Sequence, residues 1–235
     1  MKHLIETTDL SSLGNAKYDR LILDSTKNEI VYRGVNTNGH SYVDLGLPSG
    51  TLWAKYNVGA TSETAYGDYF MWGSTTPNND IPCDWEHAPF NNESRDYDEA
   101  YFNSVKDTVC PNGILAKGYD AASHIMGGDW RMPTKDEIQE LINNTTNEWI
   151  SDYDGTGVSG RKFTSKTDTS KYIFIPAAGY RYDGSVKSVG DNGNVWSSSL
   201  TAWHPSSAWF LSFYSNGCQK SDANRSIGRS VRGVL

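Results

Sequence analysis

The most reactive side chains of this 235-residue chain are three cysteine thiols, Cys83, Cys110 and Cys218. Nucleophilic catalysis or a zinc site would need such thiols beside a base or beside further metal ligands. Their number is odd, and their separations fit no metal-binding motif. A Cys83–Cys110 disulfide and three unlinked thiols are both compatible with the sequence, and neither amounts to a disulfide framework.

The histidines and carboxylates show no catalytic or metal-binding pattern either. His87, His124 and His204 have no partner at the short spacing of a zinc site. Residues 152–155 resemble the start of a calcium loop but lack oxygen ligands at alternating positions, so they predict an ordinary Asp-Gly turn. Glycoside hydrolysis needs two carboxylates a few ångströms apart, and no spacing selects such a pair. We therefore expect no catalytic residue, no metal and no cofactor.

Binding is the chemistry that the last third of the chain favours. Residues 196–199 and 226–232 combine apolar anchors with small residues, as scaffold segments do, while residues 200–225 mix aromatic with short polar side chains. Aromatic rings give contact area at low entropic cost, and polar groups orient a ligand. The candidate ligand-binding residues are Tyr182, Trp203, His204, Ser206, Ser212, Tyr214, Asn216, Gln219, Lys220, Asp222 and Asn224.

Alternation along residues 209–214 predicts which of these side chains face the core. Successive side chains of a strand point to opposite faces. If Leu211 and Phe213 are buried, Trp209 is buried with them, whereas Phe210 and Tyr214 point outward. This moves Trp209 from the ligand face toward the core.

Two predictions concern the scaffold segments themselves. Trp196 is assigned to the core because it lies within the first of them. Arg229 and Arg232 are expected to be structural and to pair with acidic residues, because a buried charge needs a partner.

The elements that position these residues are short. Thr134 and Glu137 form a capping box, and apolar residues at helical spacing follow, which predicts a helix that ends near residues 143–144. A second short helix is expected over residues 119–126. Strands are expected at residues 42–47, 51–58 and 172–176. A further aromatic run covers residues 65–72, and loops are expected at residues 73–112 and 155–170. This is an α+β pattern without the βαβ alternation of a doubly wound fold.

Two regions and an uneven charge complete the organisation. Residues 20–33 predict a hairpin within an N-terminal arm, residues 1–39, which we interpret as an attachment or oligomerisation segment; residues 40–235 form the main domain. Net charge is −7, made of −10 over residues 1–179 and +3 from residue 180 onward. This balance argues against nucleic-acid binding. No signal peptide and no membrane-spanning run is present in the sequence, so we expect neither membrane insertion nor export by the usual route.

Several motifs, taken in order, resemble one bacterial domain family. Residues 42–54, 57–60 and 66–73 (YVDLGLPSGTLWA, NVGA and YGDYFMWG) are similar to the opening of the C-type-lectin-like domain known as the Fibrobacter succinogenes major paralogous domain. The later motifs of that family are matched by WRMPT at 130–134, IPAAGYR at 175–181, NVWSSS at 194–199 and RSVR at 229–232. The resemblance covers about residues 40–235 and implies a C-type-lectin-like fold with long loops.

Within that family, the C-terminal arrangement resembles the variable proteins of diversity-generating retroelements. In those proteins a reverse transcriptase rewrites adenine positions, and the fold displays the altered residues to a ligand. Residues 196–199 and 228–232 would then be the constant frame around exchangeable contents. Trp203, Trp209, Gln219 and Lys220 cannot arise by adenine mutagenesis of an Asn codon, so not every position between the two frame segments would be diversified.

The resemblance implies a receptor-binding protein of a phage tail, located in the virion and without enzymatic activity. The expected partners are a host cell-surface protein or glycan, and phage tail proteins through residues 1–39, in a homo-oligomer such as a trimer. A bacterial surface adhesin is the alternative. A relative of the formylglycine-generating enzyme is less favoured, because Cys218 has no neighbouring cysteine. The Glu-Pro-Asn motif of calcium-dependent animal lectins is absent, so calcium-dependent sugar binding is not expected.

Overall fold

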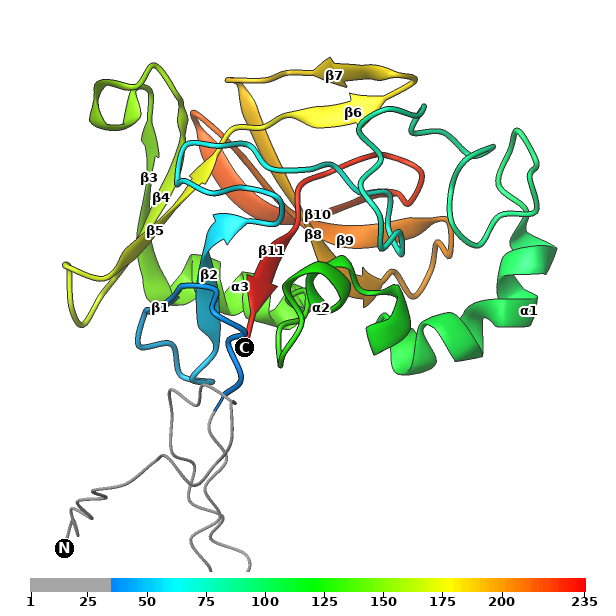
Figure 1. Ribbon diagram of the computed structural model, residues 1–235, viewed down its shortest axis with the longest axis horizontal. Coiled ribbons are helices and arrows are strands. Elements are labelled where there is room, and N and C mark those ends of the chain that lie inside the picture. The colour runs from blue at the N-terminus through cyan, green and yellow to red at the C-terminus, as the bar shows by residue number, and fades with distance from the viewer. Residues whose placement is uncertain (1–34) are drawn as a thin grey trace, which may run out of the picture.

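The computed structural model describes residues 35–235 (Figure 1). The expected hairpin over residues 20–33 and most of the expected N-terminal arm lie outside the described residues. Within the described part, three α-helices and many antiparallel strands in small sheets make an α+β domain. The expected α+β class is therefore confirmed, with three α-helices instead of the two expected.

The three helices differ in how clearly the sequence marks them. They are α1 (Glu99–Val109), α2 (Ala121–Met126) and α3 (Lys135–Asn144), with 3-10 turns at Pro111–Gly113, Lys117–Tyr119 and Tyr153–Gly155. The capping box is present at the start of α3, and the helix ends at the predicted place. Helix α1 lies inside the segment that we expected to be a loop. Only Phe102 and Val109 of its residues are buried, so its apolar pattern is too sparse to mark it in the sequence.

The strands form three three-stranded sheets and one hairpin in the described part. They are β1 (Tyr42–Asp44), β2 (Leu52–Asn57), β3 (Thr145–Ile150), β4 (Gly160–Ser165), β5 (Tyr172–Pro176), β6 (Tyr180–Tyr182), β7 (Ser185–Lys187), β8 (Asn192–Leu200), β9 (Ser207–Tyr214), β10 (Gly217–Asn224) and β11 (Arg232–Val234). The sheets are β1-β2-β11, β3-β4-β5 and β10-β9-β8, and β6 pairs with β7. The strand predicted at residues 172–176 has the predicted bounds, and those predicted at 42–47 and 51–58 exist but are shorter.

Strand β4 corrects the expectation of a loop over residues 155–170. Its polar sequence hides it, but each of its residues pairs with β3, β5 or both. Phe163 is its single large apolar side chain and is fully buried. Neighbouring strands, rather than local propensity, hold this segment extended.

The sheet β10-β9-β8 separates two apolar clusters. On one side Trp196 and Phe210 pack with Phe102 of α1 and with α2. On the other side Leu211 and Phe213 pack with α3, β4, β5 and β11. Figure 1 shows this sheet in the middle of the molecule, with α3 below it and the β6–β7 hairpin above it. The central strand β9 is thus covered on both faces along much of its length.

The two scaffold segments are buried and tied to distant parts of the chain. Trp196 is fully buried, and its indole Nε1 donates to the Phe70 carbonyl at 2.8 Å. The Trp72 indole donates to the Ser197 carbonyl at 2.9 Å, and Ser199 Oγ accepts from the Lys135 amide at 3.0 Å. The assignment of Trp196 to the core is confirmed.

Candidate ligand-binding surface

Strand pairing distributes the candidate residues over two faces of the β10-β9-β8 sheet. Directly paired residues of antiparallel strands point to the same side. Asp222 pairs with Trp209 and Lys220 with Leu211, which places these side chains on the side of α3. Gln219 pairs with Ser212, and they lie on the opposite side, together with Tyr214 and Gly217. The sequence-predicted set therefore does not form one continuous face of the sheet.

The β8–β9 loop carries Trp203 on a closed base. The Ser207 amide donates to the His204 carbonyl at 2.8 Å, and the Thr201 hydroxyl bonds both the His204 and Ser207 carbonyls. Arg225 Nε donates to the Pro205 carbonyl at 2.8 Å from below. These bonds fix the two ends of the loop, and its tip is presented to solvent with Trp203 61% exposed.

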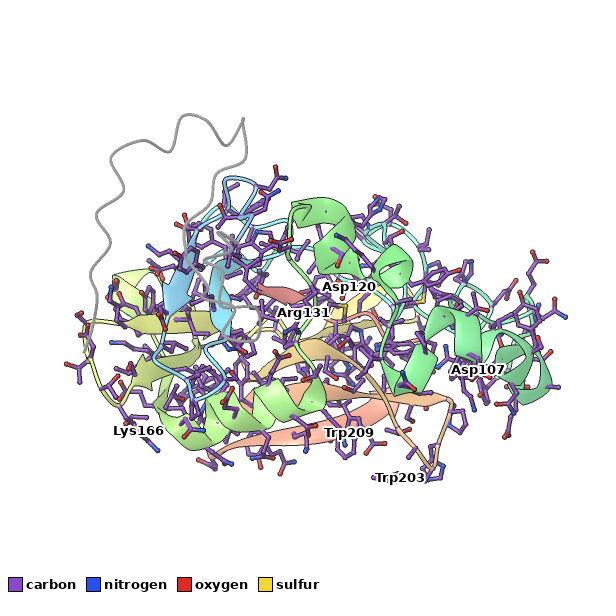
Figure 2. The ribbon with its side chains drawn as sticks, turned by 90° about the horizontal axis from the view of Figure 1, so that it is seen from below. Asp107, Asp120, Arg131, Lys166, Trp203 and Trp209 are labelled. Atoms are coloured by element: carbon purple, nitrogen blue, oxygen red, sulfur yellow. The ribbon has the colours of Figure 1, made fainter. Side chains whose placement is uncertain are left out.

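Trp203, Trp209, Lys135 and Lys220 form a surface group that we name the Trp–Lys cluster. The two indoles meet edge to face, with ring centroids 5.7 Å apart and planes at 87°. The Nζ atoms of Lys220 and Lys135 lie 5.1 Å and 6.0 Å from the Trp209 ring centroid, within cation–π range. Figure 2 shows Trp203 at the outer end of its loop, with Trp209 between it and α3.

This cluster corrects two of the alternation predictions. Trp209 was placed in the core with Leu211 and Phe213; it shares their side of the sheet but is only half-buried, because it lies next to the start of α3, where the side chain of Lys135 is beside its ring. Phe210 was predicted to point outward, but it is buried, because its side of β9 faces the apolar cluster that contains Trp196 and Phe102. The ring centroids of Phe210 and Trp196 are 5.8 Å apart. Tyr214, by contrast, is 40% exposed, as predicted.

A cleft of about 500 Å³ lies next to the Trp–Lys cluster. Helix α1, the start of α3 and the β8–β9 loop form its walls, and Lys106, Asp107, Lys135 and Pro205 are among its lining residues. Lys135 therefore belongs to both the cleft and the cluster. The sequence could not place it there, because Lys135 and Lys220 are 85 positions apart and only the packing of α3 on the sheet brings them to one indole.

The remaining candidate residues are exposed or half-buried, but they are spread out. Arg161 Nη1 donates to the Tyr214 and Gly217 carbonyls at 2.9 Å and 3.0 Å, which holds the β9–β10 turn that carries Asn216. Tyr182 is 50% exposed on the β6–β7 hairpin, on the opposite side of Figure 1 from α3. Exposed side chains at the ends of the strands and in the loops belong to His204, Asn216, Gln219 and Asn224, and half-buried ones belong to Ser206, Ser212, Lys220 and Asp222.

Contrary to expectation, Arg229 and Arg232 of the second scaffold segment pair with no acidic side chain among residues 35–235. Arg232 donates to Asn57 Oδ1 and to the carbonyls of Ala54, Lys55 and Phe174 at 2.6–3.0 Å. Arg229 stacks on Phe210 with its Cζ 3.7 Å from the ring centroid, and its Nε has no hydrogen-bond partner in the described part of the chain. Carbonyl oxygens and aromatic faces therefore take the place of carboxylates.

Arg225 is a third buried arginine, which the sequence did not single out. It has no exposed surface, and its Cζ lies 3.9 Å from the Phe102 ring centroid, with Trp72, Trp85 and Tyr97 at 5.5–5.7 Å. Burial lowers the pKa of its guanidinium to about 10. It therefore stays charged at neutral pH and joins the base of the β8–β9 loop to the long loop before α1.

The cysteines are free thiols, which decides between the two possibilities left open above. Burial raises the pKa of Cys83, Cys110 and Cys218 to about 11, so the thiolate that would act as a nucleophile is scarce at neutral pH. Residues 153–155 form a turn, as predicted. Among residues 35–235, no three His, Cys, Asp or Glu side chains are grouped to hold a metal ion, and no helix is long and apolar enough to cross a membrane.

Two other clefts are lined mostly by charged groups that have partners inside the fold; Lys171, which lines the first, makes no ion pair among residues 35–235. In a cleft of about 580 Å³ beside β1, β2 and β5, Lys55 lies 3.7 Å from Glu63, and Glu63 accepts from Tyr153. In a cleft of about 310 Å³ near α2, Arg131 donates to Glu137 at 2.7 Å, and Asp120 accepts from two backbone amides. These groups stabilise the fold and leave less unused binding capacity than the Trp–Lys cluster.

Comparison with known proteins identifies no relative: the chain matches no family model, no curated protein and no solved structure. The geometry of the surface and the sequence motifs are therefore the basis for inferring a function.

Proposed function

We propose that this protein is a non-enzymatic ligand-binding protein with a C-type-lectin-like domain. We propose further that it is a receptor-binding protein of a phage tail, which attaches to a bacterial host cell. The α+β architecture of short strands, small helices and long loops supports that fold. The order of the sequence motifs supports the family. Residues 1–39 would attach the protein to the tail or to further copies of the chain.

One observation carries this proposal: the contrast in burial between the scaffold segments and the segment that they enclose. Residues 194–199 and 228–234 are buried throughout, and their hydrogen bonds reach α3 and β2. Most polar side chains of residues 202–224 are exposed or half-exposed. Substitution of the exposed side chains would leave the core intact. A binding surface that is diversified by mutation of the gene requires this tolerance.

The few core side chains within that segment sharpen the proposal. Ala208, Phe210, Leu211 and Phe213 are buried on one side or the other of β9. These positions must stay constant, so diversification would fall on their exposed neighbours in the sequence. Sequencing the DNA beside the gene tests the retroelement directly, since the absence of both a template repeat and a reverse transcriptase gene would refute diversification.

Attachment itself is tested by capture of bacterial cells on the immobilised full-length chain, across a panel of strains. The combined variant His204→Ala, Tyr214→Ala and Asp222→Ala should lose capture, because it removes contacts from both sides of the sheet and from the loop. Tyr101→Ala is the matched control, because Tyr101 is 39% exposed, like Tyr214, but lies on α1. Both variants should keep the wild-type melting temperature.

Three outcomes of these experiments decide against the proposal. Capture of no strain by the wild-type chain would refute a binding function. Equal capture by the wild-type chain and the combined variant would refute the predicted contact role of His204, Tyr214 and Asp222. Detection of the protein in cell envelopes, and never in purified virions, would assign it to a bacterial surface instead of a phage tail.

A further inference from the structure

Three lysines at one edge of the molecule have no acidic partner. Lys106, Lys135 and Lys220 make no ion pair within 4.0 Å anywhere in residues 35–235. Asp107 lines the same cleft and Asp222 lies on the same side of β10, but neither reaches these ammonium groups. The three ammonium groups are therefore available to an external anion.

A buried charge adds to the positive field of this edge. Arg225 lies beneath the β8–β9 loop without exposed surface, and its guanidinium has no acidic partner within 4.0 Å among residues 35–235. The charges of Arg225 and Lys106 both act on Cys110, which lines the cleft. Lys106, Lys135, Lys220 and Arg225 are thus four cations in this region, against the carboxylates of Asp107, Asp222 and Asp136, the last in the first turn of α3 beside Lys135, although the whole chain carries −7. Walls of low dielectric constant strengthen such a local field.

The lysines of the Trp–Lys cluster favour an anion, whereas its exposed indole, Trp203, favours a ligand with a flat apolar face. Trp203 meets Trp209 edge to face, so the flat faces of the Trp203 indole are not stacked on its partner, and the side chain is 61% exposed. The C–H face of a pyranose ring packs well on a flat indole, since it is apolar and similar in area. An acidic peptide would also pair with the lysines and could pack a side chain on this ring, so the comparison of the two acidic polymers below decides between them.

The adjacent cleft has a suitable size and shape. Its volume of about 500 Å³ lies within the range of about 300–1,000 Å³ that is usual for small-ligand sites, and it opens to solvent. Lys135 contributes to both the cleft and the cluster. A polymer could therefore place one residue in the cleft and stack the next on Trp203.

We propose that the Trp–Lys cluster and this cleft bind an acidic polysaccharide whose sugar rings carry carboxylate groups, without a metal ion. This inference rests on the proposed function and names the class of its receptor. The lysines pair with the carboxylates, and Trp203 stacks on a sugar ring. Lys106 and Lys135 lie outside residues 200–225, so part of the site belongs to the constant scaffold.

Binding of the full-length chain to polygalacturonate, compared with neutral dextran and with polyglutamate, tests the inference. The wild-type chain should bind polygalacturonate and not dextran, and it should bind more weakly as salt rises from about 50 to about 200 mM. The double variant Lys135→Gln, Lys220→Gln should bind polygalacturonate roughly ten-fold more weakly. Trp203→Ala should weaken binding by roughly 30-fold, the usual effect of losing an aromatic anchor.

Lys166→Gln is the matched control, because it removes one exposed lysine charge at the far end of α3, where Lys166 Nζ donates to the Asn143 carbonyl. It should bind like the wild-type chain. Unchanged melting temperatures would show that the substituted chains are folded.

The inference fails if the wild-type chain does not bind polygalacturonate, if dextran binds equally well, or if the lysine variants bind like the wild type. Preference for polyglutamate over polygalacturonate would identify an acidic protein as the ligand and refute the proposal of an acidic polysaccharide. Cell capture separates the two levels: capture without polygalacturonate binding refutes only the ligand class, whereas the absence of any capture refutes the proposed function itself.

Discussion

Arg229 and Arg232 lie three positions apart, are both buried, and should respond in opposite ways to the same substitution. Burial lowers the pKa of each guanidinium from 12.5 to about 9. Arg232 offsets this cost with hydrogen bonds to four oxygen atoms, whereas Arg229 has aromatic faces and no hydrogen bond from Nε. Methionine has a similar length and no charge, so Arg→Met at each site isolates what the guanidinium contributes.

The magnitudes follow from these surroundings. A pKa lowered from 12.5 to about 9, mainly by burial, corresponds to about 5 kcal/mol of net destabilisation of the charged form, at about 1.4 kcal/mol per pKa unit. Stacking on Phe210 at 3.7 Å and on Trp196 at 4.9 Å returns about 2 kcal/mol each. Arg229→Met should therefore raise the free energy of unfolding by roughly 1–2 kcal/mol, with methionine sulfur packing on the same rings.

Arg232→Met should lower the free energy of unfolding by about 3–5 kcal/mol. It leaves buried carbonyl oxygens of β2 and β5 without their donor, and each unsatisfied buried acceptor costs about 1–3 kcal/mol. Urea denaturation followed by circular dichroism measures both changes at neutral pH. Equal destabilisation by the two substitutions would refute the reasoning, because it would mean that Arg229 is stabilised by more than the aromatic faces that surround it.

Three further results are expected. Phe210→Ala should destabilise the fold by about 3–5 kcal/mol in the same assay, whereas Tyr214→Ala should stay within about 0.5 kcal/mol, since the first ring is 6% exposed and the second 40%; similar values would contradict the assignment of their sides. Burial raises the pKa of Glu137, but hydrogen bonds from Arg131 and Thr134 outweigh this and lower it below 4.5. The stabilisation from Glu137 is thus present above pH 4.5 and lost as pH falls through the folded-state pKa; Glu137→Gln should cost about 1–2 kcal/mol at pH 7 and less at low pH, and an equal cost at both would refute the ion pair. The three thiols should react with a maleimide at pH 7.5 far more slowly in the folded chain than in urea; equal rates would contradict their burial.

Local patterns in the sequence determined the features that depend on neighbours along the chain. The capping box of Thr134 and Glu137 marked the start of α3, because both partners lie within one helical turn. Trp196 and the segments 196–199 and 226–232 were identified as scaffold from their composition, and all but Ile227 are buried. The candidate residues Trp203 and Tyr214 were identified as exposed aromatics for the same reason.

Only the tertiary structure decided the features that depend on what packs against them. Strand alternation cannot show that β9 has a core on both sides, so Phe210 was wrongly placed outward. Alternation gave the correct side for Trp209 but could not show that this residue is only half-buried. Distant elements bury Phe102 and Val109 of helix α1, and strand β4 is held by its pairing with β3 and β5 and by the burial of Phe163. Lys135 and Lys220 meet over one indole only because α3 lies along the sheet. Sequence spacing carries no information about such contacts, since they are set by packing between segments that are far apart in the chain.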